Sequence, residues 1–292
     1  MSLALLVFTL LAIALVIAGL NWLIRHSLRA PRILEQGSPA QRGLVYQTVS
    51  IPGVRNKQLF GWYIPAPDNA RAPAVAVLHG WGSNAEMMLP VAVPLNQAGY
   101  AVLLFDARCH GRSDDDNFAS LPRFAEDLDC ALAWLVQQPG VDAANIAVLG
   151  HSVGAGAVLL AASRRKDIAA VISVAAFSHP ASMMRRFLAV RHVPYMPLGW
   201  YVMRYVQRII GHRFDAIAPR HTITQIRCPV LLVHGSDDTI IPVSEAREIH
   251  ARRRSDAVQL LILPGEHDSS AELERHADKL LAFLNQATRT GV

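Results

Sequence analysis

Asn-Ile-Ala-Val-Leu-Gly-His-Ser-Val-Gly, residues 145–154, is the stretch of sequence that decides the fold. Its apolar run at 146–149 has the length and content of a buried strand, and the small residues at 155–162 favour a helix. Between strand and helix lies the pattern Gly-x-Ser-x-Gly, with Ser152 at its centre. In this context the pattern predicts a sharp, strained turn that exposes a nucleophilic serine at the carboxyl edge of a sheet.

The residues around Ser152 suit that role. Gly150 and Gly154 have no side chain, so strand and helix can approach each other closely. The start of the helix supplies free N–H groups and the positive end of a dipole, which stabilise developing negative charge. The alternative interpretation is a small-residue helix start that merely packs well.

A serine hydroxyl is a weak nucleophile near neutral pH, so it requires a base that is itself oriented by a carboxylate. After its last two predicted strands the chain supplies an acid and then a histidine. The strand at 230–233 precedes Asp237 and Asp238. We expect Asp238 to be the orienting acid, with Asp237 as the alternative and otherwise a turn cap. The strand at 258–263 precedes His267, the predicted general base.

The turn after the first buried strand, at 74–78, reads His-Gly-Trp-Gly-Ser. Its glycines let the chain turn tightly over the nucleophile and point a backbone N–H inward. The N–H groups of Trp81 and Val153 are therefore predicted to form an oxyanion hole. An ordinary glycine-rich turn is the alternative.

The loop after the strand at 101–105 is dense in polar residues. It supplies no member of the catalytic triad of serine, acid and histidine that we predict. We interpret Asp106 and Arg108 as an ion pair that holds the turn. His110 and His151 each lie beside a turn glycine, but neither follows an acid in the order that the triad requires. Neither is therefore predicted to be the base.

Strands and helices alternate along most of the chain, after a hairpin predicted at 44–51 and 59–64. Buried strands are predicted at 74–78, 101–105, 146–149, 168–174, 230–233 and 258–263, with helices at 85–97, 122–136, 155–162, 244–253 and 270–285. This alternation predicts an α/β fold, with a mostly parallel sheet covered by helices on both faces. Asp127 and Asp129 fall on one of these helices, where we expect a solvated face.

The first 24 residues carry no charged side chain. As a helix they would be roughly 36 Å long, enough to cross a hydrocarbon core of about 30 Å. Arg25, Arg29 and Arg32 follow directly, so the positive-inside rule places the domain after them in the cytoplasm. We therefore predict a single transmembrane anchor at 1–26. A cleaved signal peptide and a buried core helix are the alternatives.

A juxtamembrane linker is predicted at 27–43 and a catalytic domain at 44–292. Cys109, Cys130 and Cys228 are odd in number and unclustered, which suits a reducing compartment. We interpret all three as small buried hydrophobic residues. The net charge is +5, but the chain has no nucleic-acid recognition motif, so we do not expect nucleic acid as a partner.

With these motifs in this order, the sequence resembles the α/β-hydrolase superfamily over about residues 44–287. The similar stretches are 79–82, 106–113, 150–154, 234–242 and 265–267. The resemblance implies an eight-stranded type of sheet, the roles given above for Ser152, Asp238 and His267, and an oxyanion hole from Trp81 and Val153. It implies no metal or organic cofactor. One departure is Cys109, where many members carry Gly, which makes the turn less permissive.

The strand–helix rhythm breaks at 178–228, where the family usually carries a lid over the active site. No acidic residue occurs from 168 to 214, whereas Met and aromatic residues are frequent. The same stretch contains six arginines, Arg185, Arg186, Arg191, Arg204, Arg208 and Arg213. One interpretation is a cap that contacts the membrane surface and admits acyl chains. The other is a cap packed on the sheet with its arginines in water.

Within the superfamily the chain is most similar to the serine-aminopeptidase-like branch and to the bacterial esterase- or lipase-like branch. We expect a serine hydrolase that cleaves carboxylic esters, of acyl or lipid-like substrates, through an acyl-enzyme intermediate. A thioesterase or peptidase of the same fold is the alternative among enzymes. A non-catalytic, membrane-tethered scaffold is the alternative outside them.

Overall fold

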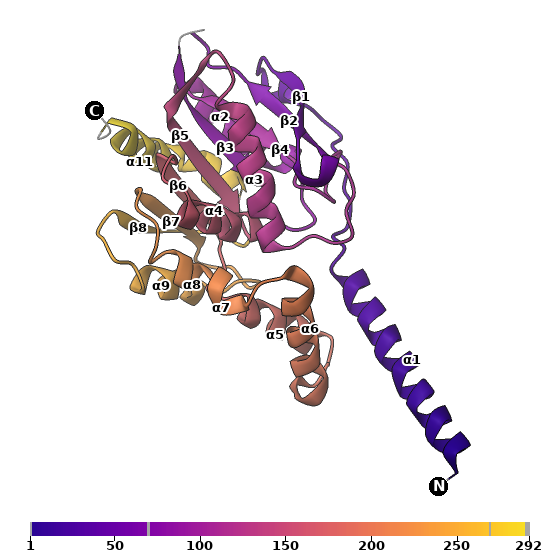
Figure 1. Ribbon diagram of the computed structural model, residues 1–292. Helices are drawn as coiled ribbons and strands as arrows, with labels where there is room; N and C mark the ends of the chain where they lie inside the picture. Colours follow the sequence, from indigo (N-terminus) through magenta and orange to yellow (C-terminus); the bar gives the residue numbers. More distant parts are fainter. Residues whose placement is uncertain (1, 69–70, 269, 290–292) are drawn as a thin grey trace.

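The computed structural model describes residues 2–68, 71–268 and 270–289, which contain an eight-stranded sheet and its covering helices (Figure 1). The strand order is β1-β2-β4-β3-β5-β6-β7-β8. Strands β3 to β8 all run parallel to one another. Strand β2 is antiparallel to both of its neighbours, β1 and β4. The bounds are β1 (Gln47–Pro52), β2 (Gln58–Ile64), β3 (Ala72–Leu78), β4 (Ala101–Phe105), β5 (Val141–His151), β6 (Ala170–Val174), β7 (Val230–Gly235) and β8 (Val258–Leu263). The predicted α/β-hydrolase architecture is confirmed.

Helices cover both faces of this sheet (Figure 1). Residues of α2 and α11 belong to the core on one face, and residues of α3 and α4 to the core on the other. The helices are α1 (Leu3–Ser27), α2 (Leu89–Gln97), α3 (Leu121–Leu135), α4 (Val153–Arg164), α5 (Pro180–Val190), α6 (Trp200–Ile210), α7 (Phe214–Ile217), α8 (Pro219–Thr222), α9 (Ser244–Ala251), α10 (Ser270–Arg275) and α11 (Ala277–Arg289). The domain therefore has two hydrophobic layers with the sheet between them.

The central strands are continuous apolar runs because both of their faces are buried. On β3, Val75 and Val77 enter one core, while Ala74, Ala76 and Leu78 enter the other. Each buried side chain contributes roughly 25 cal/mol per Å² of apolar surface removed from water. A polar residue on either face of such a strand would lose this stabilisation, so the sequence cannot alternate as it does in a half-buried strand.

The structure differs most from the prediction at three elements, and other ends move by up to three residues. Strand β5 begins at Val141, five residues before the predicted start, because residues 142–145 are only partly buried and give no apolar signal. The helix predicted at 85–97 opens as the 3-10 turn Ala85–Met88, and α2 follows with Pro90 in its first turn. The closing helix predicted at 270–285 is two helices, α10 and α11.

The predicted ion pair between Asp106 and Arg108 is wrong. Arg108 is buried, and its Nε donates to Asp127 Oδ1 at 2.8 Å while its backbone N–H donates to Asp127 Oδ2 at 2.9 Å. The predicted solvated face is therefore also wrong at Asp127, which is fully buried, whereas Asp129 is half-exposed and pairs with two arginines of the surface. A guanidinium removed from water needs a buried carboxylate, and Asp127 is placed to supply it.

The cysteines divide between two environments. Cys109 is buried, which confirms the prediction for that residue. Cys130 and Cys228 are only half-buried, so the prediction that all three are buried is wrong for these two.

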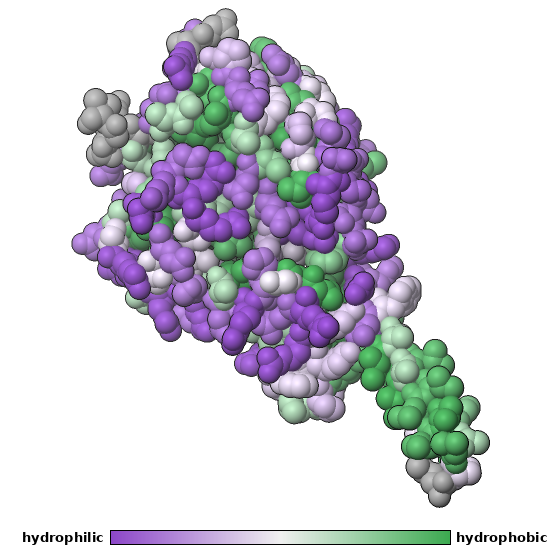
Figure 2. All heavy atoms as spheres, viewed as in Figure 1, coloured by the Kyte–Doolittle hydropathy of each residue, from purple (hydrophilic) through white to green (hydrophobic). Residues whose placement is uncertain are grey.

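Helix α1 stands away from the domain as a continuous hydrophobic surface (Figures 1 and 2). It has 25 residues, and its most apolar window has a mean hydropathy of 2.9, so it is long and apolar enough to cross a membrane. A signal sequence at this place in the chain has the same properties. Met1 of the predicted anchor and residues 290–292 of the predicted catalytic domain lie outside the described residues.

The segment after α1, predicted as a linker at 27–43, is held on the domain by hydrogen bonds. Arg32 donates to the backbone carbonyls of Gly111 and Ser113, at 2.8 Å each. The side-chain amide of Asn84 donates to the carbonyl of Ile33 at 3.0 Å. The end of α1 is therefore connected to the domain by a fixed segment rather than by a free tether.

We predict that Asp127→Ala destabilises the protein by about 3 kcal/mol, because the buried Arg108 guanidinium loses its buried partner and keeps only Glu126 at 2.9 Å and Asp116 at 3.5 Å. Asp129→Ala is the matched control, for which we expect about 1 kcal/mol or less. Urea unfolding of the full-length chain in a mild detergent measures both. Equal effects of the two substitutions would contradict the assignment of Asp127 as the partner on which Arg108 depends.

Candidate active site

The turn that carries Ser152 joins β5 to α4 and has a strained backbone. Ser152 has φ 54° and ψ −115°, in the positive-φ region that side chains other than glycine rarely adopt. A Cβ on Gly150 would lie 2.3 Å from the carbonyl oxygen of Gly154, and a Cβ on Gly154 would lie 2.4 Å from that of His79. Gly150 is therefore required where β5 meets α4, and Gly154 where α4 meets the end of β3.

The structure brings Ser152, His267 and Asp238 together from three different strand ends. The Ser152 hydroxyl lies 3.0 Å from His267 Nε2, and His267 Nδ1 lies 2.7 Å from Asp238 Oδ2. Because a carboxylate can only accept, Nδ1 carries the imidazole proton and Nε2 is free to accept from the hydroxyl. All three residues are buried, so this hydrogen-bonded chain is shielded from water.

The turn after β7 distinguishes the two neighbouring aspartates. Asp238 is buried, and its Oδ1 accepts hydrogen bonds from the backbone N–H groups of Ile240 at 2.9 Å and Ile241 at 2.7 Å. Asp237 is exposed, and its side chain accepts from the backbone N–H of Gly265 at 3.2 Å, so it connects this turn to the loop that carries His267 rather than capping the turn as the alternative predicted. Of the two aspartates, the one that contacts His267 is therefore Asp238.

His234 holds this turn in place, and the sequence analysis assigned it no role. The side chain is fully buried, and its Nε2 donates to the carbonyl of Ile241 at 2.7 Å. The same nitrogen lies 3.4 Å from Asp238 Oδ2. Burial lowers the pKa of His234, so the imidazole remains neutral while it fixes the carboxylate. Its position directly after an apolar run, in the stretch His-Gly-Ser-Asp-Asp, was the available signal.

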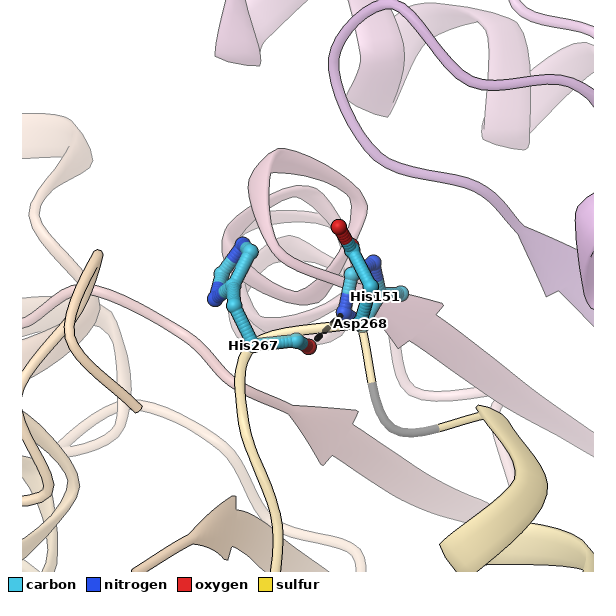
Figure 3. Close-up of side chains that lie close together, drawn as sticks. All are labelled: His151, His267 and Asp268. Atoms are coloured by element: carbon cyan, nitrogen blue, oxygen red, sulfur yellow. Dashed lines mark hydrogen bonds between the residues drawn. The ribbon is translucent and has the colours of Figure 1, made fainter. Parts of the chain in front are cut away.

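His151 supports His267 from the other side. Its Nε2 lies 2.9 Å from the backbone carbonyl of His267, and Figure 3 shows this carbonyl directed at the His151 ring while the ring of His267 points elsewhere. Burial and the neighbouring His267 lower the pKa of His151, which favours the neutral form. His151 therefore positions the loop that carries His267.

The side chains of His151, His267 and Asp268 lie close enough for one ligand atom from each to be within 4.8 Å of the others (Figure 3). That spacing suits a metal ion by distance alone. Both ring nitrogens of His267 already face protein groups, Ser152 Oγ and Asp238 Oδ2. Metal binding at His267 would therefore break the hydrogen-bonded chain that it forms with these two residues.

The turn predicted to form the oxyanion hole lies against Ser152. A Cβ on Gly80 would be 3.1 Å from the Cβ of Ser152, so the next residue, Trp81, follows within the same tight turn. Neither the Trp81 N–H nor the Val153 N–H donates a hydrogen bond within the described part of the chain. Both amides are therefore available to an oxygen atom at the serine.

Buried His79 fixes this turn to the loop after β4. Its Nε2 accepts from the backbone N–H of Ala107 at 3.0 Å, so its Nδ1 carries the proton and donates to the carbonyl of Gly80 at 2.7 Å. Burial and neighbouring His110 lower the pKa of His79 well below its usual value, so the ring stays neutral. The imidazole therefore holds the turn of the predicted oxyanion hole in a fixed position relative to the loop after β4.

With this geometry in hand, comparison with known proteins identifies the family. The sequence model described as serine aminopeptidase, S33, matches residues 69–214, half of the chain. An uncharacterised protein of Mycobacterium tuberculosis is 30% identical over 254 residues, which are 87% of this chain and 82% of that protein. The chain belongs to the serine aminopeptidase family of α/β-hydrolases.

Two further relatives extend the comparison for this α/β-hydrolase. A polyketide transferase of Aspergillus fumigatus is 35% identical over 131 residues, which are 44% of each chain. The esterase Pf2001 of Pyrococcus furiosus is 24% identical and has a TM-score of 0.72, with 89% of this chain and 98% of that chain covered. At that identity the structural similarity establishes the fold.

Two open clefts, each of about 350 Å³, reach the His267 loop of the hydrolase from different sides. The first is lined partly by Ser83, Met87, His151, Asp268 and Leu273. The second is lined by the His267 loop, the turn after β7 and the start of α10. No residue of the segment 178–228 lines either of these two clefts.

A second buried acidic group lies next to this site and was missed in the sequence analysis. Glu35, from the segment after α1, is buried against Asp106, whose two oxygens accept from the backbone N–H groups of Ala85 at 2.7 Å and Arg112 at 2.8 Å. Burial, and then the neighbouring Glu35, raise the pKa of Asp106 to about 8. A lone glutamate in a polar linker gives no sequence signal that it is buried.

We predict that Asp106→Asn reduces the pH dependence of stability in this hydrolase. The unfolded chain loses the Asp106 proton near pH 4, whereas the folded chain keeps it to about pH 8, so the free energy of unfolding falls as pH rises through this window. Asparagine stays neutral and removes that slope. Urea unfolding at pH 5 and pH 8 measures it, with exposed Asp115→Asn as the control. A slope unchanged by Asp106→Asn would contradict the raised pKa.

Proposed function

We propose that this protein is a serine hydrolase that cleaves carboxylic esters. Ser152 is the nucleophile, His267 the general base and Asp238 the acid that orients it. The observation that carries the proposal is the unbroken chain from Ser152 Oγ to His267 Nε2, 3.0 Å, and from His267 Nδ1 to Asp238 Oδ2, 2.7 Å. Membership of a hydrolase family supports it.

The proposed reaction is acyl transfer to water through Ser152. His267 takes the hydroxyl proton as Ser152 attacks the ester carbonyl, and the carbonyl oxygen gains negative charge. The N–H groups of Trp81 and Val153 donate to that oxygen, at the positive end of α4. His267 then protonates the leaving alcohol. A water molecule, activated by the same imidazole, releases the acid and restores Ser152.

We infer an ester, rather than a thioester or peptide, as the substrate class. The cleft beside His151 has apolar lining residues that include Met87, Leu89 and Leu273, which suit an acyl chain, although charged residues also line it. The structurally similar Pyrococcus furiosus protein is named an esterase, and the related Aspergillus fumigatus protein a polyketide transferase. A thioesterase is the second candidate, because the same site and mechanism would accept a thiol leaving group.

We further propose that α1 is retained as a membrane anchor at 1–26, so that membrane lipid is a partner of this enzyme. The end of α1 supports retention, because Ile24 is buried and Arg25 Nε donates to the Tyr205 hydroxyl of the domain at 2.8 Å. The arginines at 25, 29 and 32 all follow the apolar stretch, which favours a catalytic domain in the cytoplasm.

We predict that Ser152→Ala lowers kcat for p-nitrophenyl esters by about 10⁴-fold or more, because the nucleophile is lost while binding groups remain. A series of acyl-chain lengths, assayed on the full-length enzyme in detergent, gives the size of the acyl pocket. Circular dichroism shows that the variant is folded. Ester hydrolysis that survives in a folded Ser152→Ala variant would contradict the proposal.

Substitutions at the neighbouring residues Asp238 and Asp237 test which aspartate orients the base. We expect Asp238→Asn to lower kcat by about 10³–10⁴-fold, because the amide no longer holds His267 in the reactive tautomer. Asp237→Asn should leave kcat near the wild-type value, because Asp237 does not contact His267 and an amide oxygen can still accept from the N–H of Gly265. Steady-state kinetics with one ester at several pH values measures both. The reverse ranking would assign the acid to Asp237.

A further inference from the structure

The segment between β6 and β7 lies beside the end of α1. The hydroxyl of Tyr201 on α6 donates to Asn21 Oδ1 at 2.8 Å, and Arg25 on α1 donates to the hydroxyl of Tyr205 at 2.8 Å. In Figure 1 this segment and α1 project from the same side of the domain. If α1 spans a bilayer, α6 therefore lies at the membrane surface, beside the end of α1 that emerges from the bilayer.

Helices α5 and α6 bury one side and expose apolar residues on the other. Met203 and Val206 belong to a core of the domain, and Leu188 is buried near Gly199 within the segment. Five large apolar or aromatic side chains remain exposed on the outer surface of the segment: Phe187, Val190, Tyr195, Met196 and Trp200. The exposed fraction is 76% for Val190 and 62% for Met196, an arrangement that water alone does not favour.

The same outer surface carries only positive charge. Arg185, Arg191, Arg204 and Arg208 are exposed and form no salt bridge with a carboxylate of the described residues. No acidic residue occurs between 168 and 214 to oppose them. Arg186 differs, because it pairs with Glu245 of the domain and so is not part of this surface.

Three of these arginines lie over exposed aromatic rings of the segment. The guanidinium of Arg191 lies 3.5 Å from the centre of the Phe187 ring. Arg185 lies over Tyr195 at 4.9 Å, and Arg204 lies over Trp200 at 5.6 Å. Aromatic rings with adjacent cations suit the region between lipid headgroups and acyl chains, where the ring enters the apolar layer and the cation meets phosphate.

We propose that this outer surface of α5 and α6, together with residues 191–199 between them, docks on the anionic face of the bilayer that α1 enters. The proposal rests on the proposed anchor but not on the proposed esterase chemistry. Its occupant is an anionic phospholipid surface, because an unopposed positive surface with exposed aromatic residues lies next to a candidate membrane span. Docking would give the domain a second attachment and fix its orientation on the membrane.

Site-directed spin labelling of the full-length protein in nanodiscs tests the docking. A nitroxide at Met196→Cys reports on the proposed surface, one at Leu11→Cys reports on α1, and one at Val45→Cys, on the exposed approach to β1, is the aqueous reference. Labelling of the unsubstituted chain gives the background from the three native cysteines. Phosphatidylcholine discs with and without phosphatidylglycerol are compared.

In anionic discs we expect the label at 196 to be protected from a water-soluble relaxing agent and accessible to oxygen, while the label at 45 stays in water. A label at 196 that behaves like the label at 45, with the label at 11 inside the bilayer, overturns the proposal. Exposure of the label at 11 to water overturns the anchor and the docking together. Ester hydrolysis by the same samples reports separately on the catalytic proposal.

Substitutions of arginines on the proposed surface test whether an anionic lipid surface binds there. Arg204→Gln with Arg208→Gln removes two charges, each worth about fivefold at an anionic surface, so we expect the docked fraction relative to the free fraction to fall roughly 30-fold. Arg252→Gln with Arg253→Gln, which are exposed directly after α9 and outside the proposed surface, is the matched control and should change nothing. Protection at 196 that instead depends on protein concentration in detergent would show a second copy as the occupant and overturn the proposal.

Discussion

The close contact between the turn after β5 and the turn after β3 is the constraint on which the site depends. Gly154 meets the carbonyls of Leu78 and His79 so closely that a Cβ would be 2.7 and 2.4 Å from their oxygens. At the same contact Ser152 has positive φ, and a Cβ on Gly80 would lie 3.1 Å from the Ser152 Cβ. The strained serine and the two amides proposed to bind the oxyanion therefore all lie at the contact between these two turns.

Neutral buried histidines maintain the rest of the arrangement. His79 connects the turn after β3 to the loop after β4, His234 holds the turn of Asp238, and His151 contacts the carbonyl of His267. Burial lowers the pKa of each of these three rings, so they donate and accept as neutral groups. The remaining imidazole, His267, faces the hydroxyl of the serine, and its orientation is set by its neighbours.

The fold and the residues that meet at the site were predictable because they follow from local patterns. Apolar runs mark the buried strands, and a parallel sheet brings their carboxyl ends to one edge, so Ser152, Asp238 and His267 had to lie near each other. The partner of Arg108 was not predictable, since Asp127 looks like any charge on an amphipathic helix. Glu35 was missed for the same reason, because its burial depends on how a distant segment packs. Cys109 stands at φ 68°, where glycine is less strained, and its Sγ contact with Asp116 offers one compensation.

The central claim is that Ser152 is an activated nucleophile. The most direct measurement is reaction of the folded, full-length protein with a fluorophosphonate, followed by mass spectrometry of the intact chain and of its peptides. We expect one covalent adduct per chain, on the peptide that contains Ser152. An adduct on another residue, or a folded protein that forms none in detergent and in lipid, would contradict it.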